Sequence, residues 1–353
     1  TAAMPAFRTV VVTEVLSERP GLTRVAVRRP VDSRDDAPEA EPAVERAYAL
    51  TDVIGPVGVG DRVVVNTTAV DLALGTGGWH VVHWNLNRGD WTGAGGGHVM
   101  KVRYTSLQAD TGVAEEHDPD IPTDLGGVPV VACSLHSQVG VVAATIADLA
   151  ADLRVAYVMT DGGALPMALS DLVADLRARG LLVGTVTTGH AFGGDREAVS
   201  IPSGLTVARH EWDAQVIVAG MGPGVVGTGS RLGFSGLDQA TILDSTAWLG
   251  GRPVACLRAS DGDARERHRG VSHHTTTVLD ATRSGVDVVV PDGLDPGAVP
   301  GRHRVVTVDP PDVVGALAAA DLKVTTMGRG PDRDPLFFRA AAAAAAHAVT
   351  LAS

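Results

Sequence analysis

The sequence predicts an α/β protein in which a small, β-rich, barrel-like domain precedes a mostly parallel, doubly wound α/β domain. Short Val-rich segments of alternating polarity, separated by turn signals, fill the first third of the chain. From residue 128 onward, Val-rich runs without alternation are each joined by a helical pattern, which is typical of a parallel sheet covered on both faces. A length of 353 residues also exceeds what one compact core usually takes.

We expect residues 1–110 to form the first domain, residues 111–127 a linker, and residues 128–353 the second domain. The stretch from residue 109 to 127 is acidic, contains prolines and is poor in large apolar side chains, which is typical of a linker. In the first domain, strands are expected at residues 7–15, 23–28, 45–50 and 62–66.

The second domain is expected to alternate strands and helices. The expected strands are residues 128–133, 154–159, 181–186, 214–219, 253–257, 286–290 and 304–308. The expected helices are residues 139–153, 167–179, 237–249, 274–283 and 312–320, and a hairpin is expected at residues 198–209.

Composition narrows the classes of partner. A net charge of −12 disfavours a nucleic-acid surface or an anionic membrane as partner, and no apolar run approaches the length that spans a bilayer. Residues 1–12 show no secretory signal, and the two cysteines, Cys133 and Cys256, lie in strand-like apolar runs. Because free buried thiols suit a reducing compartment, we expect a cytoplasmic protein, with a disulfide between these cysteines as the less favoured alternative.

Several polar segments follow predicted strands directly, and the carboxyl ends of parallel strands are where ligands bind. One loop joins His190 to Asp195 and Glu197, a combination that can supply an acid or base with its orienting carboxylate. His136 and Asp161 also follow strands and are further catalytic candidates. For each of them, a turn, a helix cap or a satisfied surface histidine is the alternative.

Glycines at 222, 224 and 227 have the spacing of a dinucleotide-binding fingerprint. The context is poor, because Thr228 and further glycines follow where a helix should begin. We therefore expect Gly222, Gly224, Gly227 and Thr228 to let a ligand or the other domain approach the backbone, with a simple turn as the alternative. A nucleotide cofactor is disfavoured.

The segment from residue 258 to 276 combines arginines with histidines at a predicted helix start. His273 is a catalytic candidate, and Arg267 and Arg269 are candidate clamps for carboxylate or phosphate. His268 and His274 are candidate ligand-binding residues. Adjacent histidines are expected to point apart, so at most one of His273 and His274 should enter a given metal site. No spaced metal motif occurs and no residue is assigned to a metal, although a divalent metal stays an open alternative.

Seven strings together resemble a bacterial family catalogued as a domain of unknown function (family 3866). They are residues 66–70, 74–78, 97–105, 135–138, 189–198, 222–236 and 268–275. The resemblance covers nearly the whole chain and implies that the two parts form one unit. It adds His98 and Lys101 to the ligand-binding candidates, beside Gly77 and Gly78. It implies no activity.

These patterns favour a hydrolase or group transferase that acts on a small anionic metabolite where the two domains meet. The first alternative is a non-catalytic ligand-binding or assembly protein, in which glycine-rich loops and tryptophans serve subunit packing. The second is an oxidoreductase with a nucleotide cofactor. A homo-oligomer is expected.

Overall fold

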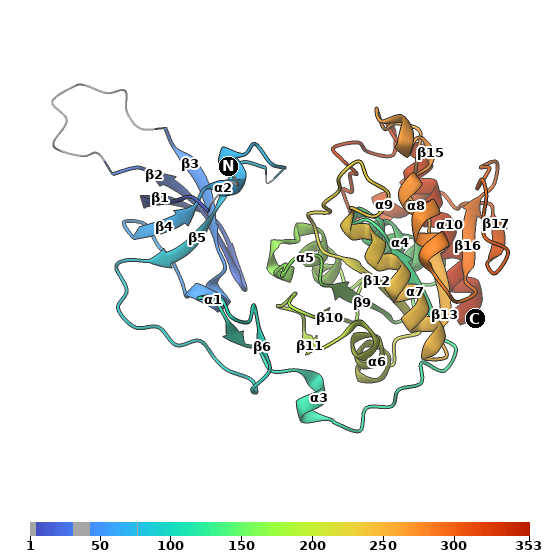
Figure 1. Cartoon of the computed structure of the whole chain (residues 1–353), viewed down its shortest axis with the longest axis horizontal. Helices are drawn as coiled ribbons and strands as arrows, with labels where there is room; N and C mark the ends of the chain where they lie inside the picture. The colour runs from blue at the N-terminus through green and yellow to red at the C-terminus, as the bar shows by residue number, and fades with distance from the viewer. Residues whose placement is uncertain (1–4, 31–42, 76) are drawn as a thin grey trace. The chain divides into compact units, whose positions relative to one another are not determined.

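The computed structural model of the chain describes residues 5–30, 43–75 and 77–353. The chain forms two compact units, Thr1–Asp110 and Thr111–Ser353, each drawn in Figure 1. The predicted fold class is confirmed, since a five-stranded barrel is followed by a parallel sheet of eight strands with helices.

The first unit is a closed barrel with the strand order β1-β2-β3-β5-β4. Inward-facing valines such as Val10, Val25 and Val63 are fully buried and alternate with outward residues, as the period of a strand requires. The strands are β1 (Phe7–Arg19), β2 (Leu22–Arg28), β3 (Glu45–Ala49), β4 (Arg62–Asn66) and β5 (Trp79–Asn85). Short elements complete the unit: α1 (Thr51–Ile54), α2 (Thr68–Asp71), β6 (Met100–Lys101) and β7 (Ala109–Asp110).

The second unit is built on an eight-stranded sheet with the order β11-β10-β9-β12-β8-β13-β16-β17. Every neighbouring pair in it is parallel. The strands are β8 (Pro129–Cys133), β9 (Val155–Thr160), β10 (Gly184–Thr188), β11 (Arg196–Ala198), β12 (Val216–Met221), β13 (Arg252–Cys256), β16 (Asp287–Pro291) and β17 (Arg304–Val308). The central strands are buried on both faces, which is why their sequences read as continuous Val-rich runs.

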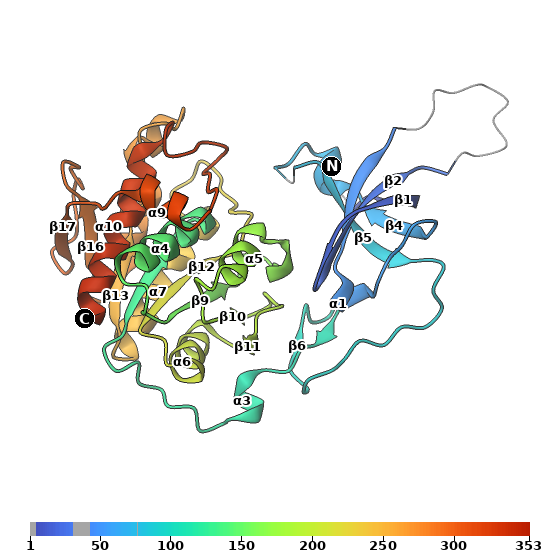
Figure 2. The ribbon, with the colours of Figure 1, turned by 180° about the vertical axis from the view of Figure 1, so that it is seen from behind.

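Helices cover both faces of this sheet, as the opposite views in Figures 1 and 2 show. One face packs against α4 (His136–Leu149), α5 (Asp171–Ala178), α9 (Val313–Ala319) and α10 (Pro335–Ala352). The other face packs against α6 (Ile201–Glu211), α7 (Asp238–Trp248) and α8 (His273–Ala281). The one-turn helix α3 (Ala114–His117) and three short 3₁₀ helices, η1 (Met167–Leu169), η2 (Ser235–Leu237) and η3 (Glu266–His268), lie in the connections.

The expected hairpin and the expected linker differ from the structure. The hairpin expected at residues 198–209 is instead the end of β11 followed by α6, because Ser200 and Pro202 form a helix start that outweighs the apparent alternation. Residues 111–127, expected to be a linker, belong to the second unit. Leu125 in this stretch is fully buried, and its backbone N–H donates to the carbonyl of Leu249.

In the described residues, α10 is the one helix long and apolar enough to cross a membrane, by length and composition alone. The expectation that no segment approaches that length is therefore wrong. However, 56% of this helix is buried inside the protein, where Phe337, Phe338 and a run of alanines pack against the sheet and α4. These are the properties of a core helix as well as of a membrane span.

The start of α10 is anchored by the carboxylate of Asp334, which is completely buried. It accepts hydrogen bonds from Ser260 Oγ at 2.8 and 2.9 Å and from the backbone N–H of Asp261 at 3.2 Å. Arg329 Nη2 lies 2.9 Å from the same carboxylate. The segment that follows β13 is thereby tied to the C-terminal helix.

We expect Asp334→Ala to lower the free energy of unfolding of the second unit by about 3–5 kcal/mol, because it removes a fully buried carboxylate that pairs with Arg329 and accepts hydrogen bonds from Ser260 and Asp261. Urea titration followed by the helical signal in far-ultraviolet circular dichroism measures this free energy, since the long helices lie in the second unit. Asp332→Ala, at an exposed aspartate two residues away, is the control. A loss below about 1 kcal/mol would contradict the anchoring role.

Candidate functional site

The carboxyl ends of β12, β8 and β13 form a topological switch point. β8 lies between β12 and β13 in the sheet. The chain leaves β8 for α4 on one face, whereas it leaves β12 and β13 for α7 and α8 on the other face. In open α/β sheets, ligands bind in the crevice where neighbouring connections diverge in this way.

Two buried glutamines hold the strand ends where the hydrogen-bond ladder between β8 and β13 stops. Gln138 Nε2 donates to the carbonyl of Leu257 at 2.8 Å, and its Oε1 accepts from the backbone N–H of Ser134 at 3.0 Å. Gln239 Nε2 donates to the carbonyls of Ala132 at 2.6 Å and Cys256 at 2.9 Å. These side chains satisfy backbone groups that the divergence would otherwise leave unpaired.

The connection from β13 to α8 contains a short hairpin, β14 (Ala259–Ser260) with β15 (Gly270–Val271), and η3. Buried Asp263 holds its centre, because Arg265 donates to the carboxylate from Nε at 2.9 Å and from Nη2 at 2.8 Å. The Arg265 guanidinium holds the pKa of Asp263 well below its usual range. Ser272 then begins α8 by accepting the backbone N–H of His274 at 3.2 Å.

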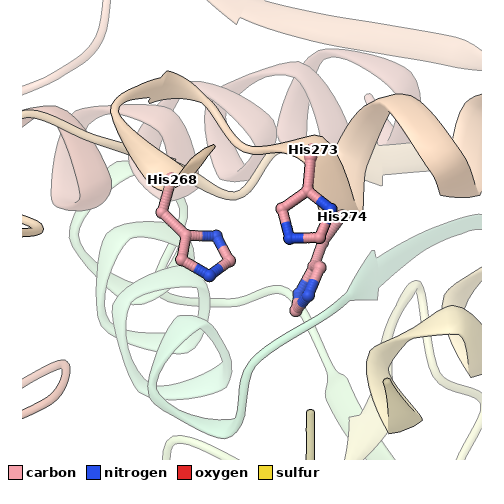
Figure 3. A group of neighbouring side chains, drawn as sticks. All are labelled: His268, His273 and His274. Carbon is pink, nitrogen blue, oxygen red and sulfur yellow. The ribbon is translucent and has the colours of Figure 1, made fainter. Parts of the chain in front are cut away.

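Three histidines from this segment face one another, as Figure 3 shows. His268 lies on η3, and His273 and His274 are the first two residues of α8. Their ring centroids are 4.4–5.0 Å apart, and one ring nitrogen from each lies within 4.8 Å of the other two. His268 and His274 are buried and His273 is partly exposed.

The surroundings fix the orientation of each ring. His268 Nδ1 lies 2.7 Å from Ser272 Oγ, and His274 Nδ1 lies 2.8 Å from Arg258 Nη1. Because an arginine can only donate, His274 Nδ1 is an acceptor, and the proton of this neutral ring lies on Nε2. His274 also stacks on Phe234, with ring centroids 3.7 Å apart and an interplanar angle of 4°. His273 Nε2 is buried and has no hydrogen-bond partner among the described residues.

All three imidazoles are held neutral at pH 7. Burial, reinforced by the charge of Arg258, lowers the pKa of His268 to about 4 and that of His274 to about 3. Burial and the charge of Arg267 also lower the pKa of His273. The cluster therefore offers lone pairs and N–H donors without adding charge of its own.

Arg258 is the residue that most requires a ligand. Its side chain is only 6% exposed, and no ion pair links it to a carboxylate in the part of the chain that the structure describes. Burial and the neighbouring charge of Arg265 lower the pKa of Arg258 to about 10, so it remains charged at pH 7. A buried charge without a counter-ion costs several kcal/mol, and a bound anion would offset that cost.

The glycine-rich loop after β12 returns as a hairpin. Gly227 pairs with Phe234, and the backbone N–H of Thr228 donates to the carbonyl of Gly233 at 2.7 Å. The next helix, α7, begins only at Asp238, so no helix start stands behind Gly222 and Gly224 as a dinucleotide loop requires. The hairpin instead places Phe234 on the histidine cluster.

His136 has both ring nitrogens occupied. Nδ1 lies 3.1 Å from the carbonyl of Met221 and Nε2 lies 2.6 Å from Ser170 Oγ. Asp161 likewise makes structural contacts, accepting the backbone N–H groups of Ala164 at 2.7 Å and His190 at 2.9 Å. Its position requires Gly189, because a Cβ there would lie 2.7 Å from that of Asp161. These residues join the loops after β8, β9, β10 and β12.

The structure does not bring Asp195 and Glu197 to His190. Asp195 accepts from the backbone N–H of Thr185 at 3.0 Å and pairs with Arg177, near the amino end of β10. Glu197 accepts from Thr187 Oγ1 at 2.5 Å, whereas His190 follows the carboxyl end of β10. Both carboxylates therefore hold the edge of the sheet.

Arg267 and Arg269 are exposed on the segment that carries the cluster. Arg269 Nε donates to the carbonyl of Asp263 at 3.0 Å. Gly77, Gly78, His98 and Lys101 all lie in the first unit. Gly77 and Gly78 form the turn before β5, where Arg46 Nη2 donates to the carbonyl of Gly77 at 2.7 Å. Lys101 is only 1% exposed, whereas His98 is exposed.

Sequence reasoning did not select Arg258, Asp263 or Phe234. Arg258 could have been found from its place directly after a buried strand, the same signal that selected the polar loops. The roles of Asp263 and Phe234 had no comparable signal, since each depends on a contact with a distant part of the segment. The expectation that His273 and His274 point apart is corrected, because their ligand atoms belong to one group with His268.

Cys133 and Cys256 are both buried and free, so the disulfide alternative is not formed. They lie on neighbouring strands β8 and β13 and face the same core. Burial raises the pKa of the Cys133 thiol, and its neighbour Cys256 raises it further. A thiol in this state is a poor nucleophile, so the pair contributes to packing.

Comparisons with known proteins identify a family and no activity. A family model described as "Protein of unknown function (DUF3866)" matches residues 46–345. A search of the curated proteins found no match. Among solved structures, the chain is similar to the crystal structure of YjeQ from Thermotoga maritima, at 13% identity and a TM-score of 0.14. That match covers 58% of this chain and 66% of the other, just under two thirds, and at this TM-score it carries no argument.

We expect stability to fall as the pH drops from about 6.5 toward 4, in part because of His136. Its burial lowers its pKa to about 4, so the unfolded chain binds a proton that the folded chain excludes in this window. The contribution is complete above pH 6.5 and lost below pH 4, and its size is of the order of 3 kcal/mol.

Urea titrations at pH 7.0, 5.5 and 4.5 should show a shallower pH dependence for His136→Gln than for the unaltered protein. His210→Gln, at a partly exposed histidine on α6, is the matched control. Equal slopes for His136→Gln and the unaltered protein would show that His136 is not held neutral.

Proposed function

The chain belongs to the DUF3866 family of unknown function, and from the geometry of its site we propose that it binds a small anionic molecule and acts on it as a hydrolase or group transferase. The proposed site lies at the carboxyl ends of β8, β12 and β13 and is formed by Arg258 and the three histidines. The observation that carries the proposal is the buried guanidinium of Arg258, which has no carboxylate partner among the described residues.

The local charges favour an anion. Arg265 pairs with Asp263 and Arg329 with Asp334, whereas Arg258 makes no ion pair with a described carboxylate and hydrogen-bonds to the neutral ring of His274. The charge of Asp263 also acts on Arg258, but the charges of Arg265, Arg329 and Arg267 oppose it. The planar guanidinium suits carboxylate or phosphate oxygens, which it can bind through two parallel N–H groups. The ring of His274 also carries a donor, Nε2–H, because its Nδ1 accepts from Arg258.

Space for the rest of a ligand exists beside the cluster. A cavity of about 710 Å³ is lined by His273, Thr276, Thr277 and Asp280 of α8, by Arg231 of the hairpin, which pairs with Asp280, and by Val299 and Pro300. Threonine hydroxyls and a partly exposed imidazole are groups that can orient a small polar molecule. His273 thus lies where the anion site meets this cavity.

His273 is the residue we assign to proton transfer. Its pKa is lowered, so the ring is a base at pH 7, and its buried Nε2 has no described partner to displace. In hydrolysis, an attacking water bonds to the electrophilic centre of the substrate, the bond to the leaving oxygen breaks, and the proton of the water passes to the imidazole. In group transfer, a second substrate's hydroxyl replaces the water.

Binding is tested by calorimetric titration of the full chain with inorganic phosphate. We expect binding that Arg258→Met removes, whereas Arg209→Met, which removes the same charge from a partly exposed position on α6, leaves binding unchanged. A hydrogen bond to a charged group contributes about 1.5–3 kcal/mol, which predicts a loss of affinity of roughly 10- to 150-fold. Equal phosphate affinity in Arg258→Met and the unaltered protein would contradict the proposal.

Turnover is tested with a panel of small phosphate and carboxylate esters. We expect His273→Ala to lower kcat by about 10²- to 10⁴-fold, the usual contribution of a general acid or base. His117→Ala, at an exposed histidine on α3, should have no effect. Binding of phosphate without turnover of any ester would favour the alternative of a non-catalytic ligand-binding protein.

A further inference from the structure

We infer that His268, His273 and His274 form a binding site for one divalent transition metal ion of the zinc type. The inference begins from the convergence in Figure 3, where three imidazoles from two short elements face a common point. One ring nitrogen from each lies within 4.8 Å of the others. Zinc–nitrogen bonds of about 2.0–2.1 Å place the nitrogens of a tetrahedral site about 3.4 Å apart, so small side-chain rotations would close the site.

The choice of metal follows from the donor atoms. All three ligands are imidazoles, which suit Zn²⁺, Co²⁺ and Ni²⁺, whereas Mg²⁺ and Ca²⁺ require oxygen ligands. No carboxylate belongs to the group, so a bound divalent ion would keep its full charge. With three protein ligands, the fourth position of a tetrahedral ion stays open for water or an anion.

The residues behind the rings are those that a metal site needs. His268 Nδ1 is engaged by Ser272 Oγ, which leaves Nε2 as its ligand atom and fixes the plane of the ring. Ser272 is also the N-cap of α8, so the hydroxyl that orients His268 belongs to the helix start that carries the other two ligands. His273 contributes Nε2, which is buried and makes no hydrogen bond to a described residue.

His274 couples the metal to the anion. In the structure its Nδ1 accepts from Arg258, so its proton lies on Nε2. To bind the metal through Nε2, the ring must carry its proton on Nδ1, and two N–H groups then face each other. The hydrogen bond to Arg258 would then break, and the guanidinium would be free to bind an anion. Metal and anion should therefore each increase the affinity for the other.

The role of the metal rests on the proposed function, whereas its binding does not. If the ion is bound, His273 would be one of its ligands and would no longer act as the base. The ion would then supply the activation of the attacking water. Without the ion, the three neutral rings serve only as donors and acceptors around the anion held by Arg258.

The full chain, treated with a chelator and dialysed, is titrated with Zn²⁺ by calorimetry and with Co²⁺ by visible absorption. We expect one site per chain and the intense visible bands of tetrahedral Co²⁺. His273→Ala and His268→Ala should weaken binding by more than the roughly 10- to 100-fold that is typical when a residue that only orients a ligand is removed, and His117→Ala should not weaken it. Circular dichroism establishes that each variant is folded, and His273→Ala, at a partly exposed ring, is the variant least dependent on packing.

Ser272→Ala separates a metal site from a cluster that only packs. It should weaken Zn²⁺ binding by roughly 10- to 100-fold because it removes the group that orients His268. Absence of stoichiometric Zn²⁺ and Co²⁺ binding, or a Co²⁺ spectrum that His273→Ala leaves unchanged, would overturn the inference.

Arg258→Met distinguishes the metal site from the anion site. We expect it to bind Zn²⁺ roughly tenfold more tightly or better, because a like charge and the competing hydrogen bond are both removed, while phosphate binding is lost. Zn²⁺ binding that is unchanged or weakened in Arg258→Met would overturn the coupling through His274. If phosphate binds and Zn²⁺ does not, the metal site fails and the proposed function stands. If Zn²⁺ binds and phosphate does not, the proposed function fails and the metal site stands.

Discussion

The buried carboxylate of Asp334 is the interaction on which the position of the site depends. It bonds to Ser260 and to the backbone of Asp261, and it pairs with Arg329. Arg329 Nη2 also lies 3.5 Å from the carboxylate of Asp263. This chain of contacts fixes the long connection between β13 and α8 against the start of α10. The histidines and Arg258 are placed by a segment that would otherwise be an exposed loop.

The same contacts determine which charge is left without a partner. Arg265 of the segment and Arg329, which precedes α10, pair with the two buried aspartates and balance their charge. Arg258, on the strand side of the segment, has no such partner and contacts a neutral ring instead. Among the described residues, Arg258 is the one buried arginine, and a buried guanidinium without an ion-pair partner at a switch point of the sheet has the electrostatics of an anion site.

Much of the fold could be predicted, because the spacing of apolar residues within a short segment indicates whether it forms a strand or a helix. The strand at Arg62–Asn66 and that at Arg304–Val308 have the expected bounds. Helix starts were harder to predict. Helix α4 was expected to begin at residue 139 but begins at His136, because the side chain of Gln138 accepts the backbone N–H of Leu135 and caps the first turn. Local chemistry of this kind is visible in a sequence only when the cap is a common one, as at Ser272.

The site was predicted as a region but not as a geometry. The loops after the strands contained all three histidines. Arg267 and Arg269, which the sequence favours as anion clamps, are exposed, whereas Arg258 of the same segment is buried, and exposure of this kind depends on long-range contacts that a sequence does not display. The convergence of His273 with His274 was not foreseen either. Backbone vectors of adjacent helical residues diverge by about 100°, but at the first turn of a helix the rings can fold back toward a preceding segment, and His268 lies there.

The positive charges of the arginines help to keep the imidazoles neutral. The charges that lower the histidine pKa values also oppose entry of a cation. An ion bound by three neutral rings beside Arg258 would therefore require a negative ligand at its open position, and that ligand would lie within reach of the guanidinium once it leaves His274. Under this constraint, the site is expected to bind a metal and an anion together, with the histidines as ligands of the metal and Arg258 as a partner of the anion.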